Sequence, residues 1–245
     1  MTTLGLASRQ LELLRPHEIR DRLVERSVAY LPLGTIEWHC EHLPVGLDAL
    51  TAHGVCLRAA ALDGGIVYPP LHYGTGGGHG GYPWTVMMPG AAEIEGLLRH
   101  TLERFETLGV RLVVLFTGHF ADEQIALINA ISATWNGTGH ATKALALSIN
   151  DVKGAELGPD HAGMFETTLL GALWPERVDV SRLPARAQQD WGDDDPWSAR
   201  RHDPTHPLWG VIGPDPRNYN AAGGPALLAA CVNWVVGEVD GAFPR

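Results

Sequence analysis

The stretch VRLVVLFTGH, residues 110–119, decides the fold class of this 245-residue chain. It is an almost unbroken apolar run that ends in Gly118 and His119. A run without alternating polar and apolar residues is typical of a strand buried on both faces of a parallel sheet. Three shorter apolar runs predict further strands, at residues 27–34, 66–74 and 143–150.

Segments in which apolar residues recur at helical spacing separate these runs. We predict helices at residues 15–27, 48–65, 91–109, 120–139, 165–178 and 224–243. Strands that alternate with helices indicate an α/β fold, here a single domain over residues 1–245, in which helices cover both faces of a mostly parallel sheet. Ligands of such sheets bind beyond the carboxyl ends of the strands, so polar residues that follow strands are the first candidates for a site.

The composition narrows the classes of partner. Hydrophobic residues make up 45% of the chain and charged residues 19%, which allows a sizeable core. The formal net charge of −10 disfavours nucleic acid and anionic membranes, because both carry negative charge. The three cysteines cannot form a paired framework, and no apolar run approaches the roughly 18 residues that span a bilayer. We therefore expect a reduced, cytoplasmic protein.

The segment GTIEWHCEHLPVGLDALTAH, residues 34–53, gathers metal-capable side chains directly after the first predicted strand. Glu37 and His39 point to the same side if the backbone there is extended. Carboxylate and imidazole together suit zinc, manganese or iron, and a carboxylate can bridge two ions. Asp48 alone would be interpreted as a helix N-cap, but its neighbours favour a metal ligand instead.

Two other residues of this segment have weaker claims to a metal. His42 and His53 lie in a histidine-rich loop, where a hydrogen-bonding or surface role is the more common outcome. Cys40 is interpreted as a small buried residue rather than as a soft ligand.

Two further histidines follow predicted strands. His119 ends the strongest strand, where a metal ligand is favoured over a purely structural histidine. His79 lies in the glycine-rich loop GTGGGHGGYPWT, residues 74–85, which we interpret as a loop that faces the substrate, because repeated glycine permits close approach of a backbone.

The segment PDHAGMFETTLL, residues 159–170, leaves two interpretations open. In the first, Asp160 or Thr167 caps a helix, and Glu166 is a residue of its first turn that the helix dipole favours. Alternatively His161 is a general acid or base with Asp160 as its partner, and Glu166 is a metal ligand. The Trp- and Asp-rich segment 187–210 predicts a long loop or lid.

Five segments, in the same order, resemble the creatininase (creatinine amidohydrolase) family. LPLGTIEWHCEHLPVGLD resembles the signature Pro-x-Gly-x-x-Glu-x-His-Gly-x-His-Leu-Pro-x-x-x-Asp of that family, and DHAGMFETTLL is close to its His-Ala-Gly-x-x-Glu-Thr-Ser stretch. The remaining three segments that resemble family motifs are GGGHGGYPWTVMM, LVVLFTGHF and GVIGPDP.

The resemblance implies a three-layer α/β/α sandwich and a binuclear metal site. It implies an enzyme that hydrolyses a carbon–nitrogen bond of an amide, lactam or formamide in a small, often cyclic, molecule. Zinc is the favoured metal, with manganese or iron as the alternative at one site. Family members are commonly hexameric, so a homo-oligomer is expected.

The same resemblance assigns roles to individual residues. It carries over Glu37, His39, Asp48 and His119 as ligands, with Asp48 as the bridge. Asp160 and His161 match the general acid/base region, so that His161 would carry a proton to the leaving nitrogen after attack by a metal-activated water. The residues expected to contact substrate or to line its pocket are His79, Trp84, His42, Trp191 and Trp197.

The chain also departs from the family pattern. Ala121 stands where creatininase itself has a metal-binding Glu, so a fifth ligand has to come from elsewhere. Glu166 is our choice, ahead of Asp122 and Glu123. The other departures are Thr117 for the usual Asn, and Cys40 and Trp84 for two glycines.

The departures leave other functions open. One is a metal-dependent hydrolase or isomerase that opens a polyol or sugar-like ring. The others are a non-catalytic protein that binds a metal or small ligand, and a structural subunit of a larger complex.

Overall fold

The centre of the fold is a parallel sheet of four strands in the order β2-β1-β3-β4. We describe residues 6–88, 90–185 and 195–245 of a computed structural model. The strands are β1 (Val28–Leu33), β2 (Ile66–Val67), β3 (Leu112–Thr117) and β4 (Lys143–Ser148). All three neighbouring pairs are parallel. The strand predicted from residues 110–119 therefore lies inside the sheet, paired on both edges.

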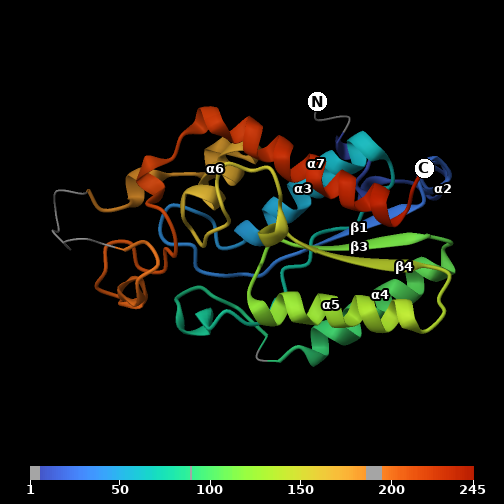
Figure 1. The fold of residues 1–245 in the computed structure, drawn as a ribbon, viewed down its shortest axis with the longest axis horizontal. Helices are drawn as coiled ribbons and strands as arrows, with labels where there is room; N and C mark the ends of the chain where they lie inside the picture. Colours follow the sequence, from blue (N-terminus) through green and yellow to red (C-terminus); the bar gives the residue numbers. More distant parts are fainter. Residues whose placement is uncertain (1–5, 89, 186–194) are drawn as a thin grey trace.

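Helices cover both faces of this sheet, which confirms the predicted three-layer architecture (Figure 1). One face carries α3 (Leu47–Asp63), α6 (Met164–Leu173) and α7 (Gly224–Ala242). The other face carries α4 (Ala92–Thr107) and α5 (Asp122–Gly137), with α2 (Pro16–Glu25) packed at the edge of their apolar cluster. Short 3-10 helices occur at Leu11–Leu13, His79–Gly81, Ile149–Asp151, Pro175–Arg177, Val180–Arg182, Ala199–His202, Pro216–Asn218 and Ala221–Gly223.

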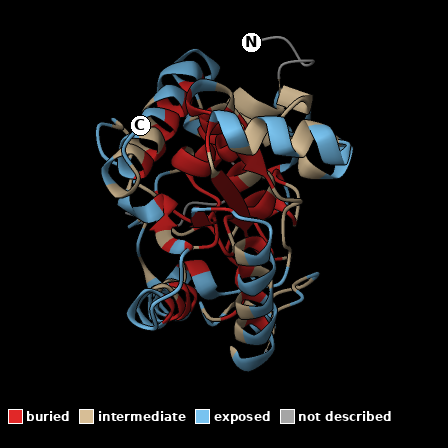
Figure 2. Ribbon diagram, turned by 90° about the vertical axis from the view of Figure 1, so that its right-hand side faces the viewer, coloured by how far each residue is buried: buried red, intermediate tan, exposed pale blue. Residues whose placement is uncertain are grey.

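The strands divide their side chains between two apolar clusters. On β3, Val114 and Phe116 belong to the cluster with α3 and α7, whereas Val113 and Leu115 belong to the cluster with α4 and α5. This alternation follows from the two-residue period of a strand. Figure 2 shows the result, with buried residues in the sheet and on the inward sides of the helices. Both faces of β3 are apolar because both are covered.

Proline limits two of the predicted elements. The strand expected at residues 66–74 is regular only over Ile66–Val67 and meets β1 again at a single bridge between Leu71 and Leu33, because Pro69 and Pro70 have no N–H for a continuous ladder. The helix expected at residues 165–178 ends at Leu173. Trp174 precedes Pro175 and leaves the helical region, with φ −142° and ψ 80°, as the clash with a following proline ring demands.

Helix α7 has the length and composition of a membrane span, although we expected no such run. In the described part of the chain, the helical segment Ala221–Ala242 is long and apolar enough to cross a membrane, with a mean hydropathy of 1.3. However, Cys231, Val235 and Val239 of this helix are fully buried in the apolar cluster between the sheet, α3 and α7. The apolar composition is thus explained by packing in the core.

Two glycines let the start of α3 approach the sheet. Gly34 follows β1 and Gly118 follows β3. A Cβ atom on Gly34 would overlap the backbone of Ala49, and one on Gly118 would overlap the carbonyl oxygen of Asp48. The first turn of α3 therefore lies directly against the carboxyl ends of two neighbouring strands.

We predict that Gly34→Ala lowers the free energy of unfolding by about 1–3 kcal/mol, because the added methyl group has to displace backbone rather than a side chain. Gly96→Ala is the matched control, since Gly96 lies inside α4 with open space around its Cβ position. This control should raise stability by about 1 kcal/mol. Urea denaturation of both variants checks the prediction, and a Gly34→Ala protein as stable as wild type would contradict it.

Candidate metal centre

Five ionisable side chains converge at the carboxyl edge of the sheet. Glu37 and His39 follow β1, and His119 follows β3. Asp48 lies in the first turn of α3 and Glu166 in the first turn of α6. All five are buried. The N-cap position of α3 is Gly46, so the capping interpretation of Asp48 does not hold and its carboxylate is free to face the cluster.

Asp48 lies between two groups of ligand atoms. Its Oδ1 is 3.0 Å from Nε2 of His39, and its Oδ2 is 3.4 Å from Nδ1 of His119. His119 Nδ1 is also 2.9 Å from Oε2 of Glu37, and His39 Nε2 is 3.6 Å from Oε2 of Glu166. Asp48 with Glu37 and His119, and Asp48 with His39 and Glu166, each form a group whose ligand atoms lie within 4.8 Å of one another. One carboxylate is thus shared by two potential metal sites.

Backbone carbonyl groups fix the tautomers of the histidines. His39 donates from Nδ1 to the carbonyl oxygen of Glu37 at 3.0 Å, and His119 donates from Nε2 to that of Thr75 at 3.1 Å. A carbonyl can only accept, so in the neutral form of each ring the second nitrogen carries the lone pair. These are the nitrogens that face Asp48. Such a second hydrogen bond is the usual way in which a protein orients a metal-binding histidine.

Several of these buried atoms have no hydrogen-bond partner. They are Oε2 of Glu37, Oδ2 of Asp48 and Nε2 of His39. With both rings neutral, the short distances quoted above bring lone pairs of nitrogen and oxygen towards one another. Buried polar atoms normally find partners, so converging lone pairs of this kind indicate the place of a cation.

The pKa values of His39 and His119 reflect the negative charge of the carboxylates around them. Burial alone would lower the pKa of His39, but the carboxylates of Asp48 and Glu166 raise it to about 10. Burial also opposes protonation of His119, and Asp48 and Glu37 raise its pKa to about 10. The negative potential that would hold a proton on each ring also favours a divalent ion, which would take the place of both protons.

His161 lies beside this cluster and is also oriented by a backbone group. Its Nε2 donates to the carbonyl oxygen of Trp38 at 2.9 Å, and its Nδ1 is 4.0 Å from Oε1 of Glu37. Burial lowers the pKa of His161 to about 3, so the ring is neutral. The free Nδ1 lone pair therefore faces the carboxylate edge of the site.

Asp160 makes the contacts of a helix cap. Its carboxylate accepts hydrogen bonds from the backbone N–H groups of Gly163, Phe165 and Glu166, at 2.9–3.2 Å. Burial raises the pKa of Asp160 to about 7, against the lowering effect of these N–H groups. Glu166 in turn accepts from the N–H of Ala162 at 2.6 Å. These bonds support the first of the two interpretations for Asp160, and they hold the turn that presents His161 and Glu166.

Backbone strain occurs next to two residues of the site, at Cys40 beside His39 and at Ala162 beside His161, and at Trp84 in the neighbouring pocket. Among the described residues, the non-glycine residues with positive φ are Cys40 (58°), Trp84 (58°) and Ala162 (54°). Cys40 and Trp84 are the positions at which the sequence replaces two glycines of the resembled motifs, and glycine adopts such angles without strain. Strained backbone of this kind persists where the surrounding structure demands a fixed geometry.

A cavity of about 300 Å³ opens onto the cluster. Besides the ligand candidates, it is lined by the predicted substrate contact His79, which also contacts Oε1 of Glu37. His202 lines it too, and its Nδ1 is hydrogen-bonded to the hydroxyl group of Tyr82 at 2.7 Å. Sequence reasoning did not single out His202 or Tyr82, because nothing in the local sequence shows that two distant loops meet here.

Other predicted contacts lie elsewhere. His42 is buried, with Nε2 3.1 Å from the Thr167 hydroxyl oxygen, and it is absent from the lining of the cavity. Trp84 is 76% exposed and lines a neighbouring pocket instead. Trp197 is exposed, and Trp191 lies outside the described residues.

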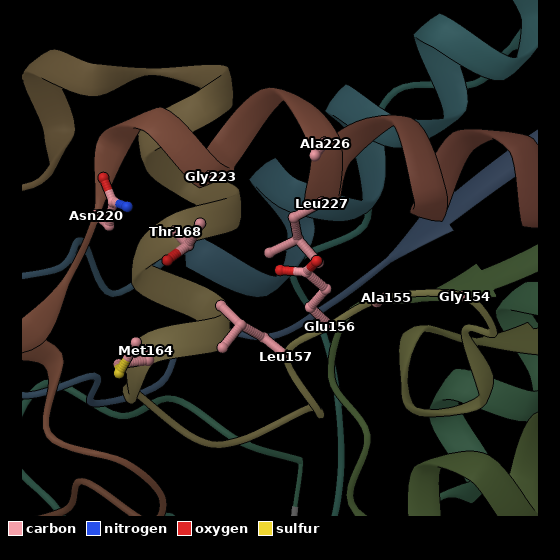
Figure 3. Close-up of a pocket in the computed structure, with 10 residues that line it drawn as sticks. All are labelled: Gly154, Ala155, Glu156, Leu157, Met164, Thr168, Asn220, Gly223, Ala226 and Leu227. Carbon is pink, nitrogen blue, oxygen red and sulfur yellow. The ribbon is translucent and has the colours of Figure 1, made fainter.

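A second cavity, of about 310 Å³, lies between α6, the start of α7 and the loop at residues 154–157 (Figure 3). Of the described residues that line it, Glu156 is the one that can ionise. It lacks a group of converging ligands, so the metal-binding potential of the described residues is concentrated at the sheet edge.

Comparisons with known proteins agree with this geometry. The family model "Creatininase: Creatinine amidohydrolase" matches residues 12–239. The creatinine amidohydrolase of Pseudomonas putida is 27% identical over 89% of this chain and 90% of its own. The mycofactocin precursor peptide peptidase of Mycolicibacterium smegmatis is 27% identical over 83% of this chain and 80% of its own.

Solved structures extend the similarity to the fold. A crystal structure of creatinine amidohydrolase superposes with a TM-score of 0.72 at 27% identity, over 97% of this chain and 98% of that one. A creatininase structure described with Mn superposes with a TM-score of 0.76 at 25% identity, over 97% and 99%. The chain belongs to the creatininase family. It is a metal-dependent amidohydrolase of that family, and the clustered ligand residues supply the means to bind divalent metal.

We predict that Asp160→Ala lowers the free energy of unfolding by about 2 kcal/mol, because several buried N–H groups at the start of α6 lose their acceptor. Asp179→Ala is the control, since Asp179 is exposed and caps only a short 3-10 turn. Its stability should change by less than about 0.5 kcal/mol. Chemical denaturation measures both values. An Asp160→Ala protein as stable as wild type would show that the carboxylate has another role.

Proposed function

We propose that this protein is a binuclear hydrolase that cleaves a carbon–nitrogen bond of an amide, lactam or formamide in a small, cyclic molecule. The observation that carries the proposal is the position of Asp48 between two histidine nitrogens whose lone pairs are directed at it. A bridging carboxylate between imidazole ligands is the donor set of a two-metal site.

The five ligand candidates divide into two sites that share Asp48. Glu37 and His119 would complete one site, and His39 and Glu166 the other. Three residues are candidates for the fifth ligand, and of these only Glu166 belongs to one of the ligand groups. Asp122 and Glu123 are exposed on α5 and belong to none of them. Zinc suits this set of nitrogen and oxygen donors, with manganese or iron as the alternative at one site. Two such ions, when bound, polarise a carbonyl and lower the pKa of a water molecule.

His161 is the residue that we assign to proton transfer. Its Nε2–H is held by the carbonyl oxygen of Trp38, which leaves Nδ1 free to accept a proton on the cavity side and to pass it to a leaving nitrogen. Asp160 positions His161 through the turn that it caps. His79 and His202 form part of the wall around the substrate.

The choice of reaction rests on the relatives and on the cavity. Both relatives named above are described as enzymes that cleave carbon–nitrogen bonds. A volume of about 300 Å³ is at the small end of the range for ligand sites, which favours a small substrate. The full set of buried ligands speaks against a site that has lost its metals. The single domain, the homo-oligomer and the cytoplasmic location stay predictions.

Activity tests the proposal. We expect metal-loaded protein to hydrolyse at least one compound in a panel of lactams, cyclic amides and formamides, and to lose this activity with a chelator. His161→Ala should lower kcat by about 10²–10⁴-fold, since it removes the group that moves the proton. Metal content measured by mass spectrometry should be unchanged in this variant. Near-full turnover by His161→Ala would contradict the assignment.

A further inference from the structure

A third cavity, of about 390 Å³, lies beside the segment that carries Glu37 and His39, and the proposed function does not use it. Three indole rings line this cavity, those of Trp38, Trp84 and Trp209, and we call it the tryptophan pocket. We propose that the tryptophan pocket is a binding site for a neutral aromatic ring, separate from the metal centre.

The position of the pocket follows from the way in which residues 37–40 divide their side chains. Glu37 and His39 belong to the metal cluster, whereas Trp38 and Cys40 line the tryptophan pocket. Successive side chains of an extended backbone point in opposite directions, which explains this alternation. The described residues that line the tryptophan pocket are all different from those that line the cavity at the metal cluster. The pocket is therefore a second site, behind the metal ligands.

The first support is strained backbone at two residues of the lining. Cys40 and Trp84 both have a φ of 58°, and both stand where the resembled motifs have glycine. Glycine adopts such angles without strain, so a side chain at either position costs stability. Burial offsets little of this cost at Trp84, which is 76% exposed. Both strained side chains line the same pocket, and strained residues cluster at sites that bind ligands.

The second support is the chemistry of the walls. Besides the three indoles, the pocket is lined by four prolines, Pro83, Pro184, Pro204 and Pro207. Glu41 and Arg182 also line it and carry opposite charges, so the lining favours neither a cation nor an anion. Aromatic rings attract one another through their quadrupoles in addition to apolar contact. A neutral aromatic ring is therefore the complement of these walls.

A sugar ring, which can also stack on tryptophan, suits the lining less well. Its hydroxyl groups would need polar partners, because a buried polar group without a hydrogen bond is costly. Two of the polar side chains of the lining already have partners. The hydroxyl group of Thr205 donates to Asp203 at 2.8 Å, and Nε of Arg182 donates to Asp179 at 3.2 Å.

The third support is that the wall formed by Trp38 is fixed before any ligand binds. Its Nε1 donates to the carbonyl oxygen of Trp209 at 3.1 Å, and the two rings lie 5.6 Å apart. The ring also packs against Gly210, where a Cβ atom would come within 2.7 Å of it. The carbonyl oxygen of Trp38 accepts the hydrogen bond from His161. A preformed wall lowers the entropy that binding has to overcome.

The test uses two neutral probes, 4-fluorobenzyl alcohol and its non-aromatic counterpart cyclohexylmethanol. Fluorine NMR titration of the metal-loaded protein gives the Kd of the aromatic probe, and competition gives the Kd of the other. Trp84→Gly removes one ring and restores the residue of the resembled motif. Trp197→Gly is the matched control, because Trp197 is an exposed tryptophan that does not line the pocket. The bromine signal in crystals soaked with 4-bromobenzyl alcohol locates the ring.

We expect wild type and Trp197→Gly to bind the aromatic probe about five-fold more tightly than cyclohexylmethanol, and Trp84→Gly to bind it about five-fold more weakly than wild type. The bromine peak should lie in the tryptophan pocket. Urea denaturation separates binding from folding. Trp84→Gly should unfold at the same urea concentration as wild type or a higher one, because glycine relieves the strain.

Four results would overturn the inference. They are no detectable binding of the aromatic probe to wild type, an unchanged affinity in Trp84→Gly, a bromine peak only outside the pocket, and a neighbouring subunit seated in the pocket. A clear loss of stability in Trp84→Gly would show that this side chain serves the fold and would contradict the argument from strain. The readouts do not depend on turnover, so failure of the proposed function and failure of this inference are distinguishable.

Discussion

The close contact between the first turn of α3 and two glycines, Gly34 and Gly118, is the constraint on which the site depends. A side chain at either position would overlap the backbone at Asp48 or Ala49. The contact brings Asp48 from the helix into the gap between residues that follow β1 and β3. Without it, Glu37 and His119 would still share a sheet edge, but no carboxylate would lie between them.

Electrostatics then explains why the cluster requires a cation. Three carboxylates and two histidines are buried within a few ångströms, and water cannot offset their cost. Protons would neutralise the cluster in part, as the raised pKa values of His39 and His119 show. Two divalent ions would neutralise the cluster more completely. The backbone carbonyls also favour their binding, because they fix the imidazole tautomers that ligate metal.

Much of this could be predicted from the sequence. Apolar runs identified β1, β3 and β4, and the rule that ligands lie beyond strand ends placed Glu37, His39 and His119 together. Other features depend on packing that one sequence does not display. The hydrogen bonds that make Asp160 a cap, the meeting of Tyr82 with His202, and the positive φ angles of Cys40 and Trp84 are set by contacts between distant segments. The contact of the His42 ring with Thr167 of α6 is likewise a product of packing between distant segments.

Anomalous X-ray diffraction from crystals of the metal-loaded protein tests the central claim most directly. The account predicts two peaks, one beside Glu37 and His119 and the other beside His39 and Glu166, with Asp48 next to both. In Glu166→Ala, the peak beside Glu37 and His119 should remain and the peak beside His39 should weaken or vanish. A single peak away from Asp48, or two undiminished peaks in Glu166→Ala, would contradict the shared-carboxylate site.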